Sequence, residues 1–137
     1  MKKKLNCVLL VDDDNDCHYF HKRLINKMII TEKLELANDG EEALTFLKSR
    51  NNGMHPKPDI IFLDLNMPGM NGWEFLEEYK KLDEELKAKI LVIVTTSINL
   101  DDRKRAENIG DVNGFKEKFL TMEVINEILL EHFPDYL

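Results

Sequence analysis

The side chains of this chain that could do chemistry follow short apolar runs. Asp12 and Asp13 come directly after the run Leu5–Val11, and Asp64 lies near the end of the run Ile60–Leu65. If both runs are strands of one parallel sheet, their carboxylates meet at one edge. Two unit charges about 4 Å apart repel by about 4 kcal/mol at an effective dielectric constant near 20. Such a cluster needs protons or a cation, and an all-oxygen site with few carboxylates suits Mg²⁺.

Hydroxyl and ammonium groups complete the set. Thr95 and Thr96 follow the apolar run Ile90–Val94, and Lys116 and Lys118 lie at the end of a later, weaker run. A divalent ion and one lysine would balance three carboxylates. A carboxylate nucleophile, a divalent cation and positioned donors are the groups that phosphoryl transfer to an aspartate requires.

Alternating strands and helices are expected to position these groups. The apolar runs predict strands over Leu5–Val11, Leu34–Ala37, Ile60–Leu65, Ile90–Val94 and Val112–Lys116. Helical spacing and capping residues predict helices over about Asn15–Ile30, after Asp39, from Asn71 to about Leu82, after Asn99 and after Thr121. This alternation indicates an α/β fold, a doubly wound parallel five-stranded sheet with its site at the carboxyl ends of the strands.

Length and charge limit the classes of function. At 137 residues, the chain is expected to form one domain over residues 1–137 with no output domain. A net charge of −7 argues against binding to nucleic acid or to an anionic membrane surface. No apolar run approaches the roughly 20 residues that a membrane span needs, and Lys2–Lys4 with Leu5–Val11 lacks a cleavage site for a signal peptide. A cytoplasmic protein with Cys7 and Cys17 as reduced thiols is expected.

Four segments resemble the receiver domains of two-component response regulators. They are VLLVDDD (8–14), PDIIFLDLNMPGMNG (58–72), ILVIVTTS (90–97) and NGFKEKFLT (113–121). The resemblance covers nearly the whole chain and keeps the order of the motifs. It implies a flavodoxin-like (βα)₅ fold with strand order 2-1-3-4-5, and a protein that is a switch and not an enzyme in its own right.

The resemblance also implies roles for the acidic residues. Asp64 would accept a phosphoryl group from a histidine kinase or a histidine phosphotransfer protein. The Mg²⁺ ligands would be Asp12, Asp13, Asp64 and the backbone carbonyl of Asn66. The downstream protein partner stays unknown, and the chain is expected as a monomer or a phosphorylation-dependent dimer.

Three further residues take roles by the same resemblance. Thr95 would hydrogen-bond a phosphoryl oxygen and Lys118 would pair with it, while Thr95 and Phe115 match the pair of switch residues. Their movement would remodel the face formed by the fourth helix, the fifth strand and the fifth helix.

The chain departs from the family pattern after this lysine. Phe119 follows Lys118, where the family has proline in a cis peptide. Because a cis bond before a residue other than proline costs about 2.5–4 kcal/mol, a trans Lys118–Phe119 bond and a shifted loop are predicted. Lys116 stays a rival, since strand alternation puts both lysines on one side, although the spacing to Phe115 favours Lys118. Thr96 stands where a smaller residue is usual, and we expect it to slow dephosphorylation.

Other functions fit less well. An aspartate-nucleophile phosphatase would need an acid–base group two residues after the nucleophile, where this chain has Asn66. A flavin site lacks a phosphate-binding loop after the first strand. A degenerate receiver that only binds proteins is the remaining alternative, supported by Phe119. His18 and His21 lack further ligands at suitable spacing and are interpreted as helix-surface residues.

Overall fold

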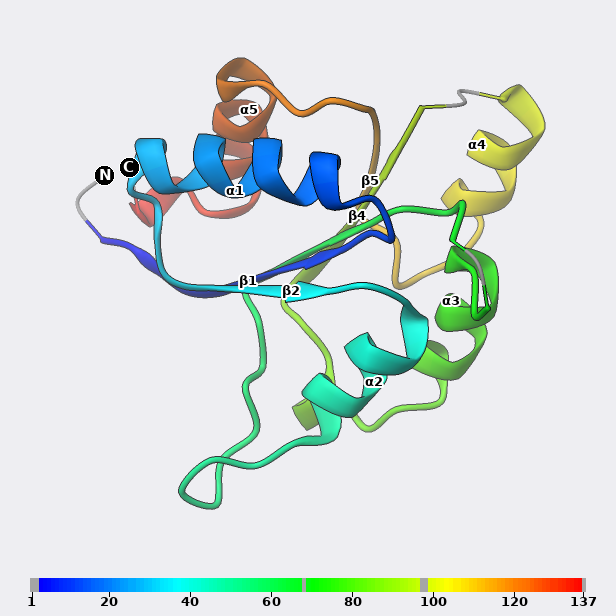
Figure 1. Ribbon diagram of the computed structural model, residues 1–137, viewed down its shortest axis with the longest axis horizontal. Helices are drawn as coiled ribbons and strands as arrows, with labels where there is room; N and C mark the ends of the chain where they lie inside the picture. Colours follow the sequence, from blue (N-terminus) through cyan, green and yellow to red (C-terminus); the bar gives the residue numbers. More distant parts are fainter. Residues whose placement is uncertain (1–2, 68, 97–98, 137) are drawn as a thin grey trace.

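The computed structural model describes residues 3–67, 69–96 and 99–136 and contains a single five-stranded parallel sheet (Figure 1). The strands are β1 (Leu5–Val11), β2 (Thr31–Ala37), β3 (Ile60–Leu63), β4 (Ile90–Thr95) and β5 (Gly114–Glu117). Their order across the sheet is β2-β1-β3-β4-β5. This confirms the predicted flavodoxin-like topology.

Four α-helices connect the strands, a fifth follows β5, and together they cover both faces of the sheet. They are α1 (Asn15–Met28), α2 (Gly40–Lys48), α3 (Gly72–Lys80), α4 (Leu100–Glu107) and α5 (Met122–His132). Short 3₁₀ turns occupy Glu84–Leu86 and Pro134–Tyr136. Figure 1 shows α1 and α5 over one face, with α2 and α3 on the other. None of the helices in the described part of the chain is both long and apolar enough to span a bilayer.

Each helix begins at a side-chain cap, which explains why the sequence marked the helix starts well. The capping side chains accept backbone N–H groups of the first turn and belong to Asp14, Asp39, Asn71, Asn99 and Thr121. The cap of α3 is a full capping box, because Glu74 also accepts the Asn71 N–H. Helix α1 ends earlier than expected, at Met28, because Ile29 adopts the left-handed conformation.

The core has two parts, one on each face of the sheet. Leu9, Ile61 and Leu91 lie in the part that α2, α3 and the buried Ala106 of α4 cover. Val8 and Phe62 lie in the part that α1 and α5 cover. The central strands are therefore buried on both faces, and all four residues of β3 and all six of β4 are buried.

The strand ends differ slightly from the expected ones. The second strand begins at Thr31 and not at Leu34, because β2 is an edge strand whose exposed polar residues hide its start in the apolar pattern. β3 ends at Leu63, so Asp64 and Leu65 already belong to the loop. The Asp64 N–H still donates to the Val11 carbonyl at 2.9 Å. This bond keeps Asp64 beside the end of β1.

Candidate functional site

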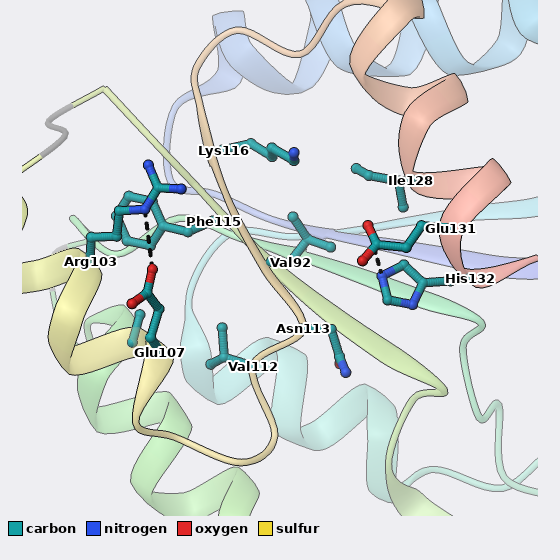
Figure 2. Close-up of a pocket in the computed structure, with 12 residues that line it drawn as sticks. Val92, Arg103, Glu107, Val112, Asn113, Phe115, Lys116, Ile128, Glu131 and His132 are labelled. Carbon is teal, nitrogen blue, oxygen red and sulfur yellow. Dashed lines mark hydrogen bonds and ion pairs between the residues drawn. The ribbon is translucent and has the colours of Figure 1, made fainter.

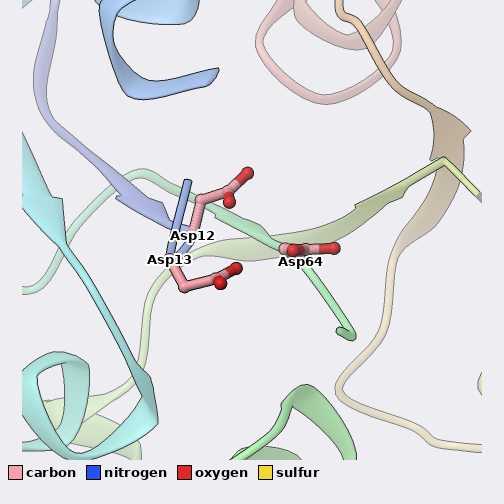
Figure 3. Close-up of side chains that lie close together, drawn as sticks. All are labelled: Asp12, Asp13 and Asp64. Carbon is pink, nitrogen blue, oxygen red and sulfur yellow. The ribbon is translucent and has the colours of Figure 1, made fainter. Parts of the chain in front are cut away.

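Three carboxylates meet at the carboxyl edge of the sheet, as the sequence predicted. Asp12 and Asp13 follow β1, Asp64 follows β3, and one oxygen of each lies within 4.8 Å of the others (Figure 3). Asp12 and Asp64 are buried, whereas Asp13 is exposed. The cluster is thus open to solvent on the Asp13 side and closed on the side of the sheet.

The loop after Asp64 is held close to the start of α3. The Asn66 N–H donates to Asp64 Oδ1 at 3.3 Å, and the Gly72 N–H donates to the Leu65 carbonyl at 3.0 Å. A Cβ atom on Gly72 would lie 2.6 Å from Leu65 Cα and 2.7 Å from the Asp64 carbonyl oxygen. Glycine at 72 is therefore required by close backbone approach, and Gly69 adopts a φ of +70° that favours glycine.

Lys118 is the cation that faces this acidic cluster. Its Nζ lies 2.8 Å from Asp12 Oδ2 and 3.4 Å from Asp64 Oδ2, and its side chain is 7% exposed. Its backbone N–H donates to the Thr95 carbonyl at 2.9 Å. Burial alone would lower the pKa of Lys118, but the hydrogen bond to Asp12 and the charges of Asp64 and Asp12 outweigh it and hold the pKa above its ordinary value.

The surroundings of Asp64 disfavour its charged form more than solvent would. Burial raises its pKa above the ordinary value, Lys118 opposes this rise, and the charge of Asp12 adds to it. One lysine therefore does not compensate the cluster, and a divalent cation would restore the balance. The oxygen-only donor set fits Mg²⁺ chemically.

The hydroxyl of Thr95 is a buried polar group at the same edge of the sheet. Thr95 ends β4 and is 1% exposed, yet its Oγ1 has no hydrogen-bond partner within the described part of the chain. Buried hydroxyls almost always have a partner. A bound group with an acceptor oxygen at this edge of the sheet would give Thr95 one.

Lys116, the other candidate lysine, lies away from the three carboxylates. Together with Phe115 it lines a cavity of about 300 Å³ between α4, β5 and α5 (Figure 2). No ion pair between Lys116 and the three carboxylates occurs within residues 3–67, 69–96 and 99–136. Both lysines precede α5, but only Lys118 lies past the end of β5 and reaches the carboxyl edge. The geometry thus favours Lys118 over its rival.

The sequence model of the response regulator receiver domain matches residues 8–129. The chain belongs to this family. Receiver domains are regulatory, and they bind Mg²⁺ at an acidic pocket; the cluster of Asp12, Asp13 and Asp64 could hold such an ion. The family also implies interaction with histidine kinases or phosphotransfer proteins.

Several known proteins are similar to this receiver domain. The probable methanogenesis regulatory protein FilR2 of Methanothrix harundinacea is 32% identical over 90% of this chain and 79% of its own length. The chemotaxis protein CheY of Pseudomonas aeruginosa is 34% identical over 88% of this chain and 90% of its own length. A two-component response regulator from Cytophaga hutchinsonii has a solved structure that is 27% identical. It superposes with a TM-score of 0.82 over 96% of this chain and 99% of its own.

One prediction for this receiver domain was wrong. The Lys118–Phe119 peptide bond is cis and not trans. The prediction used only the local preference of a non-proline peptide. Tertiary contacts hold both flanking residues: Lys118 is paired with two carboxylates, and the Phe119 ring lies 5.1 Å from that of Phe20 and 5.6 Å from that of His21.

The interpretation of two histidines was also wrong. His18 and His21 on α1 are both 5% exposed, so they are core residues and not helix-surface residues. His18 Nε2 lies 3.1 Å from the Ala37 carbonyl oxygen, and His21 Nε2 accepts the Leu120 N–H at 3.1 Å. Sequence patterns missed both because histidine is polar. The one available signal was their helical spacing with the buried Ile25.

Proposed function

We propose that this receiver domain accepts a phosphoryl group on Asp64 from a histidine kinase or a histidine phosphotransfer protein in a Mg²⁺-dependent reaction. The convergence of Asp12, Asp13 and Asp64 on one point beside a buried lysine is the observation that carries the proposal. Asp64 is the phosphoacceptor because it directly follows β3, the central strand of the sheet, and because Lys118 Nζ lies between its carboxylate and that of Asp12.

The transfer exchanges one bond to phosphorus for another. A carboxylate oxygen of Asp64 forms the new P–O bond as the P–N bond to the donor imidazole breaks, and the electron pair leaves with the imidazole. The Mg²⁺ ligands would be Asp12, Asp13, Asp64 and the backbone carbonyl of Asn66. The ion would offset the charge that gathers on the transferred oxygens.

Two groups of the chain would receive the new phosphoryl oxygens. Lys118 Nζ already lies within 3.4 Å of Asp64 Oδ2, so the ammonium can follow the negative charge from the carboxylate to the phosphoryl group. Thr95 has a buried hydroxyl without a partner in the described part of the chain, and it can donate to the same group.

The response would arise from Thr95 and Phe115. Thr95 is buried at the site, while Phe115 lies on the adjacent strand and lines the cavity between α4, β5 and α5 (Figure 2). A Thr95 hydroxyl drawn toward the phosphoryl group would leave space into which the Phe115 ring could turn. The cavity offers room for such a change, which would alter protein binding at this face. Phosphorylation need bias such an equilibrium by only a few kcal/mol.

The test is intact-mass analysis after incubation with Mg²⁺ and acetyl phosphate, which releases acetate as Asp64 is phosphorylated. We expect a single phosphoryl adduct on the natural protein, and none with Asp64→Asn or when EDTA removes the metal. Asp59→Asn is the matched control, because Asp59 is another buried aspartate, at the other end of β3. It should be labelled normally.

Each alternative function gives a different result. A degenerate receiver acquires no adduct under any condition, and that result would overturn the proposal. A phosphatase would release phosphate in many turnovers from a generic phosphomonoester without an added acyl phosphate. Label that persists in Asp64→Asn would place the acceptor on another residue.

A further inference from the structure

We propose that His21 is a positioning residue that holds the loop of Lys118 against α1 and so sets the place of the ammonium beside Asp64. The inference rests on the proposed function of Asp64, and it assigns a part in phosphoryl transfer to a buried imidazole outside the acidic cluster. Its basis is one hydrogen bond between distant parts of the chain.

The hydrogen bond joins α1 to the loop between β5 and α5. His21 Nε2 and the Leu120 N–H are 3.1 Å apart and buried, and the two residues are 99 positions apart in the sequence. A backbone N–H can only donate, so Nε2 must carry a free lone pair and the ring hydrogen must sit on Nδ1. His21 is therefore a neutral acceptor in this contact. Burial, which lowers its pKa to about 4, agrees with that state at neutral pH.

Lys118 is held at two points on the backbone, and His21 supplies one of them. On one side, the Lys118 N–H donates to the Thr95 carbonyl at 2.9 Å. On the other side, two residues later, His21 holds the N–H of Leu120, whose side chain is 1% exposed in the core. Without His21, the Leu120 N–H would lose its acceptor, and the loop of Lys118 would be held by the Thr95 contact, the charges of the site and the packing of Phe119 and Leu120.

The aromatic ring of His21 adds a packing contact to the same loop. Its centroid lies 5.6 Å from that of Phe119 and 5.7 Å from that of Phe20, while Phe20 and Phe119 meet edge to face at 5.1 Å. Phe119 is 46% exposed. The ring packing therefore leaves Phe119 about half exposed to solvent, whereas the hydrogen bond between His21 and the Leu120 N–H is buried.

Three variants separate positioning from stability. His21→Leu keeps an apolar side chain of similar size but removes the acceptor, and His21→Gln offers Oε1 in place of Nε2. Tyr79→Phe is the matched control: the Tyr79 hydroxyl accepts the Ala88 N–H at 2.9 Å, so this variant also frees one loop N–H. It lies on α3, on the other face of the sheet from α1.

The first measurement is the initial rate of labelling by acetyl phosphate at saturating Mg²⁺, at a temperature where all variants are folded. We expect His21→Leu to lower the rate about ten- to hundredfold, the order of loss that a misplacement of about 1 Å can cause. His21→Gln should stay within about threefold of the natural protein, and Tyr79→Phe should match it. A normal rate for His21→Leu, or no rescue by His21→Gln, would overturn the proposal.

The second measurement does not depend on phosphorylation. The ammonium group of Lys118 should give a distinct ¹⁵N-detected NMR signal because it is ion-paired and buried, and Lys118→Met identifies that signal by its loss. We expect the signal to persist in His21→Gln and Tyr79→Phe, and to shift or broaden in His21→Leu. If the natural protein takes up no phosphoryl group, the proposed function fails, and this signal alone decides the role of His21. An unchanged signal in His21→Leu rejects that role.

Discussion

Two buried aspartates flank strand β3, and they stand in opposite electrostatic settings. Asp59 precedes the strand and is 1% exposed, while Asp64 follows it and is 5% exposed. Asp59 Oδ2 accepts the Asn6 N–H at 2.6 Å, and its Oδ1 pairs with Lys89 at 3.2 Å. Its single negative charge is therefore satisfied by a cation of its own and by a backbone donor.

Asp64 is also buried but shares its cation with another carboxylate. It lies with Asp12 and Asp13 in a cluster whose one lysine, Lys118, is nearer to Asp12 than to Asp64. The difference teaches that burial of a carboxylate does not by itself indicate function, because Asp59 is the more buried of the two. A cluster of buried negative charges that exceeds the cations available to it does indicate a functional site.

Substitution by asparagine should have opposite effects on stability at the two ends of β3. Asp59→Asn keeps an acceptor for the Asn6 N–H but loses the Lys89 pair and buries an amide, so we expect a loss of about 1–3 kcal/mol in the free energy of unfolding. Asp64→Asn relieves repulsion and leaves Lys118 with Asp12, so we expect a gain of about 1 kcal/mol without metal. Denaturant unfolding in EDTA measures both. Equal losses would remove the contrast between the two ends.

Magnesium should stabilise the folded protein only by binding to the cluster of Asp12, Asp13 and Asp64 at the Asp64 end of β3. At a concentration one hundred times its Kd, the ion should raise the free energy of unfolding by about 2.7 kcal/mol. The Tm of Asp59→Asn should rise as that of the natural protein does, whereas Asp13→Asn should lose most of the rise because it removes an exposed ligand. Thermal unfolding with and without Mg²⁺ measures this. An undiminished rise in Asp13→Asn would place the ion elsewhere.

The backbone is also closely packed at the Asp64 end of β3, where Gly72 lies against Asp64 and Leu65. Gly72→Ala should cost about 1–3 kcal/mol, because the new Cβ meets the backbone of Leu65 and the carbonyl of Asp64. Gly110→Ala is the matched control, since no atom lies within 4 Å of its added Cβ. Denaturant unfolding compares the two. If Gly72→Ala is as stable as Gly110→Ala, the loop after β3 is not tightly held.

The smallest effect concerns the lifetime of the phosphoryl group at the Asp64 end. Thr96 is exposed next to Thr95, and we expect its side chain to hinder the approach of water. Thr96→Ala should speed loss of the label about two- to fivefold, which corresponds to a barrier lower by roughly 0.4–1 kcal/mol. The decay of the intact-mass adduct after removal of the donor measures it. Equal or slower decay would show that Thr96 does not restrict water.

The convergence of Asp12, Asp13 and Asp64 could be predicted because it depends on few, simple rules. Apolar runs marked the strands, parallel strands share a carboxyl edge, and the residues at the strand ends therefore meet. The helix starts could also be predicted, because each depends on a capping residue next to it in the sequence. The choice between Lys116 and Lys118 could not be made from alternation, because both positions have the same parity. The predicted strand also ended at Lys116, one residue before the end of β5 at Glu117.

The sequence by itself determined the order of strands and helices, the residues at the strand ends and the family resemblance, because these depend on local patterns. Only the tertiary structure decided that Lys118 joins the acidic cluster, that His18 and His21 are buried, that the Lys118–Phe119 bond is cis, and that Asp59 differs from Asp64. The physical reason is that each of these features depends on partners distant in sequence. The bond between His21 and Leu120 spans 99 positions, and no window along the chain contains both ends.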